Sequence, residues 1–239
     1  MSDWDAWAGL ALPMAAAILF FLGGSARHDR VSREGGTIFF GESLMHRGYA
    51  LVAILARGAA RMGVSPAALS WISLLFGAGA GLLAAQFRLG FAAWALAVSG
   101  LLDGLDGAVA RLAGSASQAG AVLDSALDRY VEFFLYAGLF YSFHPSLFRE
   151  SVVLLALFGS FMVTYSTAKA EALGVTPPRG WMKRAERLVW LILGACASSA
   201  ARLLGEPSAS VMVFFVGVVA VAANISAIIR LRALMRSVR

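Results

Sequence analysis

The chain has 239 residues, of which 59% are hydrophobic, and its formal net charge is +6 at pH 7. This composition, with a mean hydropathy of +0.75, excludes an ordinary soluble domain and indicates a protein of the lipid bilayer. The one cysteine, Cys196, excludes a disulfide within the chain. The sequence contains no repeat or nucleic-acid motif, so we assign the positive charge to membrane contact and expect no nucleic-acid partner.

Long apolar stretches recur along the chain, and each is long enough to cross a bilayer as a helix. They predict seven spans, at residues 6–24, 66–87, 90–111, 120–143, 151–173, 187–204 and 209–230. Strands are excluded because the stretches are too long and lack alternation with a period of two. The first span does not resemble a cleavable signal, since Asp3 and Asp5 stand where a signal is basic.

The segments between the first two spans define the domain organisation. Residues 25–43 form a polar link, whereas residues 44–62 are amphipathic and predict a helix lying in the cytoplasmic interface. We therefore expect an N-terminal transmembrane helix and cytoplasmic link over residues 1–43. Residues 44–239 would comprise the interfacial helix and a six-helix transmembrane core, which makes the fold class all-α integral membrane.

The distribution of lysine and arginine orients the predicted spans. If the link after the first span is cytoplasmic, 16 of the 20 basic residues lie on the cytoplasmic side, three lie opposite and one lies within a span. This bias predicts an outside N-terminus and a cytoplasmic C-terminus, in what we expect to be a bacterial inner membrane.

Four aspartates lie in or beside two of the apolar stretches: Asp103, Asp106, Asp124 and Asp128. A carboxylate in hydrocarbon is costly and usually functional. The spacings of three and four residues put each pair on one helix face, so two packed helices could direct all four to one point. Oxygen ligands suit Mg²⁺, Mn²⁺ or Ca²⁺ better than zinc, and four carboxylates favour a two-ion site of the kind used in phosphoryl-group chemistry.

Glycines and a cation complete this pattern. Gly104, Gly107 and Gly120 leave room for a ligand, and Arg111 is placed to meet a phosphate. In full, the pattern is Asp, two residues, Asp-Gly, two residues, Ala-Arg, eight residues, Gly, three residues, Asp, three residues, Asp. It is filled by Asp103, Asp106, Gly107, Ala110, Arg111, Gly120, Asp124 and Asp128. The chain thereby resembles the CDP-alcohol phosphotransferases, also called CDP-alcohol phosphatidyltransferases.

The resemblance implies a membrane enzyme that transfers a phosphatidyl-type group from a CDP-linked lipid, CDP-diacylglycerol, to an alcohol and releases CMP. It also implies Mg²⁺ or Mn²⁺ as cofactor and a homodimer. The metal would be held by Asp103, Asp106, Asp124 and Asp128. The nucleotide would be bound by Asp103, Gly107, Ala110, Arg111 and Gly120. Asp128 would be the general base for the acceptor hydroxyl.

The acceptor is predicted from a second basic cluster. Lys169, Arg187 and Arg230 resemble the residues by which the phosphatidylinositol-phosphate synthase branch holds an acceptor phosphate. They favour inositol 1-phosphate, with glycerol 3-phosphate or serine as alternatives; the chain departs from that branch at Ile229, where Gln is frequent. Ordinary attraction to anionic lipid is another interpretation of these charges. An ion-coupled transporter also keeps carboxylates in its helices, but it has no need of the Asp-Gly and Ala-Arg spacing.

Overall fold

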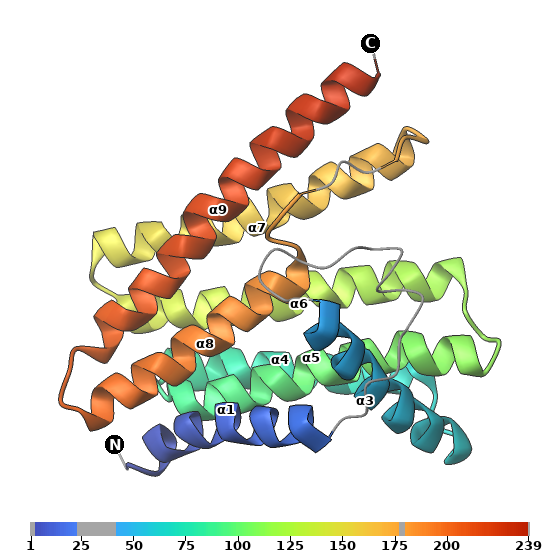
Figure 1. Ribbon diagram of the computed structural model, residues 1–239. Coiled ribbons are helices and arrows are strands. Elements are labelled where there is room, and N and C mark those ends of the chain that lie inside the picture. The colour runs from blue at the N-terminus through green and yellow to red at the C-terminus, as the bar shows by residue number, and fades with distance from the viewer. Residues whose placement is uncertain (1–2, 23–41, 177–179, 239) are drawn as a thin grey trace.

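The computed structural model describes residues 3–22, 42–176 and 180–238, and every regular element in these ranges is a helix (Figure 1). The helices are α1 (Trp4–Leu22), α3 (Glu42–Arg61), α4 (Pro66–Ala85), α5 (Leu89–Leu112), α6 (Gln118–Phe143), α7 (Leu147–Ala172), α8 (Arg184–Leu203) and α9 (Ser208–Ser237). Each predicted span and the predicted amphipathic segment coincides with one helix, which confirms the all-α class. The largest difference is that α9 extends well beyond residue 230.

Four of the described helices are long and apolar enough to cross a membrane: α4, α5, α7 and α9. The helices α6 and α8 are comparably long, but ionisable residues interrupt the first half of α6 and both ends of α8. The count of six core spans with one added span therefore stays a prediction, as does the interfacial position of α3. Most of the predicted link, residues 25–43, lies outside the described residues.

Helix α4 holds α5 and α6 in place, because both pack closely along it. Toward α6 its contacts are backbone to backbone: a Cβ added to Gly81 would lie 2.3 Å from the carbonyl oxygen of Phe134. Toward α5 its contacts are polar, since the Ser73 hydroxyl lies 2.9 Å from the carbonyl oxygen of Ser99. Small residues on α4 thus let two neighbouring helices approach on different faces.

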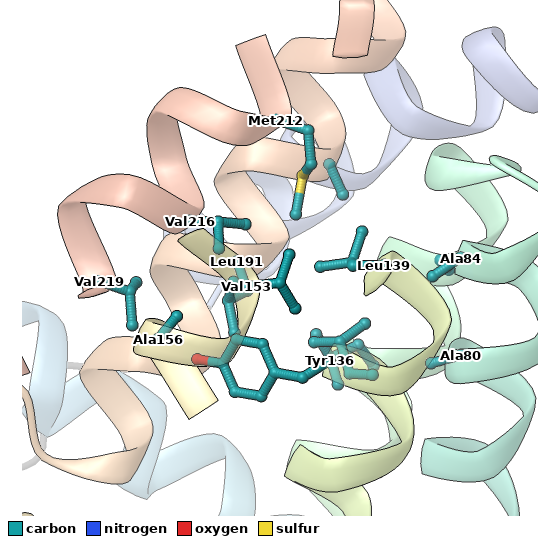
Figure 2. Packing of buried hydrophobic residues seen from close by; sticks show 14 of the residues in the cluster. Ala80, Ala84, Tyr136, Leu139, Val153, Ala156, Leu191, Met212, Val216 and Val219 are labelled. Atoms are coloured by element: carbon teal, nitrogen blue, oxygen red, sulfur yellow. The ribbon is translucent and has the colours of Figure 1, made fainter. Parts of the chain in front are cut away.

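The apolar core is shared by helices α4 to α9, and Figure 2 shows the part of it around α6. Tyr136 and Leu139 of α6 are fully buried there, with Ala80 of α4 on one side and Ala156 of α7 on the other. The Tyr136 hydroxyl lies 3.1 Å from the hydroxyl of Ser160, so the buried phenol has a hydrogen-bond partner.

A short turn joins the C-terminal end of α5 to the N-terminal end of α6. Gly114 adopts a φ of +62° in this turn, a conformation that glycine reaches without a steric penalty. The Ser117 hydroxyl then accepts a hydrogen bond of 3.1 Å from the Gly120 amide and caps α6. The turn thus joins the helix that carries Asp103 and Asp106 to the helix that carries Asp124 and Asp128.

The N-terminal helix α1 packs on α5 and α8 through specific contacts. The Phe91 amide, in the first turn of α5, donates to Asp5 Oδ1 over 2.9 Å, and Trp94 Nε1 donates to the Ala8 carbonyl over 2.8 Å. Gly90 lets the backbones approach, because a Cβ there would lie 1.8 Å from the Asp5 carbonyl oxygen. Asp5 therefore caps α5 from another helix, at the end opposite Asp103.

We expect Asp5→Ala to destabilise the protein, because the Phe91 amide loses its acceptor and the buried Asp5 side chain loses its packing. Removal of a helix cap costs about 1 kcal/mol, with a range of roughly 0.5–2 kcal/mol. Thermal unfolding in detergent measures the loss. Asp3→Ala is the matched control, since Asp3 is exposed two residues earlier, and equal melting temperatures for the two variants would contradict the capping role.

Candidate active site

Three of the four predicted metal-binding aspartates come together between α5 and α6. One carboxylate oxygen from each of Asp103, Asp124 and Asp128 lies within 4.8 Å of the other two, and each side chain is partly exposed. Asp103 belongs to α5, whereas Asp124 and Asp128 lie one turn apart on α6. The carboxylates of the two helices therefore lie together as the spacing predicts, but α5 and α6 pack closely on α4 and not on each other.

The fourth aspartate, Asp106, is held beside this group by α4. Its side chain is buried, and the Ser70 hydroxyl donates to Asp106 Oδ2 over 2.5 Å. The amide of Gly107 lies 2.5 Å from the other oxygen, Oδ1. Asp106 is therefore not one of the three clustered carboxylates, and its orientation depends on Ser70, a residue that the sequence did not single out.

Arg184, at the start of α8, contributes a cation to the carboxylate group. Its Nη1 donates to Asp103 Oδ2 over 2.5 Å, and its Nη2 lies 2.8 Å from Asp128 Oδ1. One guanidinium thus connects carboxylates of α5 and α6. Arg184 is one of the 16 basic residues that the sequence predicts on the cytoplasmic side, and no site role was predicted for it. The signal for such a role was its position one helical turn before Arg187, on the same face.

A second ion pair lies one turn deeper between α8 and α6. Arg187 donates from Nε and Nη2 to Glu132 Oε1, over 3.0 and 2.5 Å, and from Nη1 to the Met182 carbonyl over 2.7 Å. The side chain of Arg187 is only 1% exposed. The predicted acceptor residue is therefore already paired with a carboxylate. Glu132 was missed, although it follows Asp128 by four residues and so shares its helix face.

The other two predicted acceptor residues lie at the C-terminal ends of α7 and α9. Arg230 donates from Nη1 to the Thr167 hydroxyl over 3.2 Å and from Nη2 to the Trp181 carbonyl over 3.3 Å. Lys169 is exposed two residues after Thr167. Arg187 and Arg230 both bond carbonyls of residues 181–182, so the segment before α8 brings these two arginines to one region.

The predicted nucleotide-binding residues lie at the same end of the bundle as the carboxylates. Gly107 makes room for a cation, since a Cβ there would lie 3.3 Å from Arg111 Nη1. Arg111 is exposed in the last turn of α5, and Ala110 beside it is partly exposed. Gly120 is exposed in the first turn of α6. A charged ligand can reach this surface, where carboxylates and an arginine are accessible and the glycines have no side chain to block its approach.

Apolar helices, a carboxylate cluster at their ends and the spacing of the aspartate motif define a membrane-bound transferase of phosphate-linked groups. The sequence model for CDP-alcohol phosphatidyltransferase matches residues 63–229, from just before α4 into α9, and the chain belongs to this family. It is accordingly an integral membrane enzyme of phospholipid biosynthesis, as the resemblance implied. The match begins after both α1 and α3, so those two helices lie outside the part that defines the family.

Among individual relatives, the phosphatidylinositol phosphate synthase of Mycobacterium marinum is 33% identical over 171 residues, which cover 70% of this chain and 73% of that protein. The corresponding enzyme of Mycobacterium tuberculosis is also 33% identical and covers 70% of this chain and 79% of its own length. The archaetidylinositol phosphate synthase of Pyrococcus horikoshii is 39% identical over a shorter match, 42% of this chain and 52% of that protein.

Solved structures agree with this assignment. The crystal structure of Mycobacterium tuberculosis phosphatidylinositol phosphate synthase with CDP-DAG bound superposes with a TM-score of 0.68 at 28% identity, over 77% of this chain and 92% of that one. A structure of the same enzyme in complex with manganese and citrate gives the same TM-score and covers 88% of that chain. The shared fold therefore includes most of the six-helix region.

We expect Glu132→Gln to be strongly destabilising, because it leaves the buried Arg187 guanidinium without its counter-charge. Breaking a buried ion pair on one side costs about 3–5 kcal/mol. Thermal unfolding is the measurement, and Glu171→Gln, an exposed substitution with the same change of charge, is the control. The double variant Glu132→Gln/Arg187→Met should be more stable than Glu132→Gln; a single variant as stable as the control would disprove the pair's contribution.

Proposed function

We propose that this enzyme transfers the phosphatidyl group of CDP-diacylglycerol to the hydroxyl of inositol 1-phosphate and releases CMP. The observation that carries the proposal is the group of Asp103, Asp124 and Asp128 within the family motif, with Arg184 of α8 paired to two of them. The mycobacterial relatives, named as phosphatidylinositol phosphate synthases, support the choice of acceptor. Glycerol 3-phosphate and serine are the alternatives that the experiment below includes.

The donor set fits a hard divalent cation. Three carboxylate oxygens within 4.8 Å of one another are ligands that Mg²⁺ and Mn²⁺ accept, and no nitrogen or sulfur ligand is needed. The residues that would hold two such ions are Asp103, Asp106, Asp124 and Asp128. When bound, the ions supply positive charge that stabilises the negative charge developing on the pyrophosphate of the CDP-lipid.

The chain's own residues would then bind and orient both substrates. Gly107, Ala110, Arg111 and Gly120, with Asp103, line the proposed nucleotide site at the α5–α6 turn. Asp128 would accept the proton of the acceptor hydroxyl. The hydroxyl oxygen forms a bond to the β-phosphorus as the bond from that phosphorus to the CMP oxygen breaks, and the proton stays on Asp128 until water removes it.

The acceptor phosphate would be bound where α7, α8 and α9 converge. Lys169 and Arg230 supply charge from two of these helices, and Arg187 supplies it from the third. Because Arg187 is paired with Glu132 and Arg230 bonds Thr167 and Trp181, exposed Lys169 is the residue with most charge available for a new anion. The homodimer and the cytoplasmic position of the site are further parts of this proposal.

The test is CMP release by the purified protein with CDP-diacylglycerol and Mg²⁺, using inositol 1-phosphate, glycerol 3-phosphate, serine and free inositol in parallel. We expect inositol 1-phosphate to be the best acceptor and EDTA to abolish release, with recovery on adding Mg²⁺ or Mn²⁺. Lys169→Ala should raise the KM for inositol 1-phosphate much more than that for the CDP-lipid. Full activity in chelator would refute the metal role, whereas a preference for serine or inositol would refute only the acceptor.

The roles of the aspartates are separable by substitution. Asp124→Asn should weaken cation binding and CDP-lipid binding together, because it removes a ligand from the cluster. Asp128→Asn should lower kcat by about 10²–10⁴-fold, the usual contribution of a general base, while CDP-lipid binding persists. Steady-state kinetics and direct binding of the CDP-lipid distinguish the two effects. Near-normal turnover by Asp128→Asn would exclude this residue as the base.

A further inference from the structure

Arg184 differs from the other cations of the site in what it contacts. Arg187 is enclosed and paired with a glutamate outside the aspartate motif, but Arg184 pairs with two aspartates of the motif itself, Asp103 and Asp128. These are two of the three residues whose oxygens lie within 4.8 Å of one another. The guanidinium and a divalent cation would therefore use the same carboxylates.

The charges explain why a cation is needed there. Three clustered carboxylates repel one another, and their partial burial reduces the screening of that repulsion by water. Arg184 connects Asp103 on α5 with Asp128 on α6 from a third helix, α8, and offsets part of this charge. In the ion-free protein, the cluster is thus stabilised by a positive group that belongs to the chain.

The geometry also indicates that the guanidinium can be displaced. The strongest arginine–carboxylate pairs are bidentate, with two parallel hydrogen bonds to a single carboxylate. Arg184 instead divides its two terminal nitrogens between two carboxylates. Its Nη2 contact with Asp128 is an ion pair without hydrogen-bond geometry, and its buried Nε and Nη2 atoms have no hydrogen-bond partner among the described residues. A divalent cation carries twice the charge and would bind the same oxygens more strongly.

We propose that Arg184 is an internal counter-ion of Asp103 and Asp128, and that divalent cations displace it from these two carboxylates when they bind. The inference rests on the metal-dependent transfer proposed above. It assigns to Arg184 the role of lowering the affinity of the carboxylates for cations. Cation binding would then be coupled to release of the guanidinium from the two carboxylates. Reciprocally, any ligand that binds the released guanidinium would favour cation binding.

The experiment is a Mn²⁺ titration of the purified protein in detergent without CDP-lipid, followed by the electron paramagnetic resonance signal of free Mn²⁺. Arg184→Gln should bind Mn²⁺ about 10- to 100-fold more tightly than the wild type, because a unit charge beside two ligands has been removed. Lys183→Gln is the matched control: it removes the same charge from the adjacent exposed residue, and its affinity should change less than about twofold.

A second readout reports on the ion-free protein. Without Mn²⁺, Arg184→Gln should melt at a lower temperature than the wild type, and saturating Mn²⁺ should raise its melting temperature by more than it raises that of the wild type. Arg184→Lys, which keeps the charge but has one terminal nitrogen in place of two, should have an intermediate Mn²⁺ affinity.

The outcomes separate this proposal from the proposed function. A folded Arg184→Gln protein with unchanged or weaker Mn²⁺ affinity overturns the counter-ion role and leaves metal-dependent transfer intact. Tighter Mn²⁺ binding by Arg184→Gln in a protein that releases no CMP from any acceptor supports the counter-ion role and overturns the transfer reaction. Equal tightening by Lys183→Gln also overturns the proposal, because the effect would then be general surface charge.

Discussion

The concentration of negative charge at one end of the bundle is the constraint on which the arrangement of the helices depends. Asp103, Asp124 and Asp128 lie close enough to repel one another strongly, in surroundings that are only partly hydrated. Such a cluster persists only if other elements supply compensating groups. Here α8 supplies Arg184 and α4 supplies Ser70, which bonds Asp106. Four helices therefore converge at the point where the sequence places its acidic residues.

Helix α4 makes this convergence possible because both helices that carry the aspartates pack against it. Its glycines admit the α6 backbone, and its serines bond α5. The closest packing of α5 and of α6 is in each case with α4, so the two acidic helices are positioned by a common neighbour and meet each other through their carboxylates. At the opposite end of α5, Asp5 of α1 caps the helix and α1 also packs on α8. Helix α1, which lies outside the family match, thus contacts both of the helices that carry Asp103 and Arg184.

The basic residues at this end serve more than one purpose. A count of charges along the chain orients the spans, but it treats every arginine as equivalent. In the folded protein Arg184 pairs with Asp103 and Asp128, Arg187 pairs with buried Glu132, and Arg230 bonds the segment before α8. Several charges that the positive-inside bias would explain are therefore structural parts of the site, and Lys169 is the exposed one among the predicted acceptor residues.

The sequence alone determined the helices, the family and the identity of the acidic residues. Apolar stretches of bilayer length have few other stable conformations, and aspartates in such stretches are too costly to occur without a role. Their spacings of three and four residues then predicted which helix faces meet. These signals are local, since each depends on residues within one or two turns of a helix. The two helices are also consecutive in the chain, joined by the short turn at residues 113–117.

Only the tertiary structure decided which partner each charged group has. Asp103 and Arg184 are 81 residues apart, and Arg187 and Glu132 are 55 apart. No pattern within a single helix predicts such pairs. Long arginine side chains reach several carboxylates with similar ease, so the choice depends on the positions that α4, α5 and α8 take when they pack. The same packing turns Asp106 toward Ser70, although in sequence it is equivalent to Asp103, because burial demands a hydrogen-bond partner for its carboxylate.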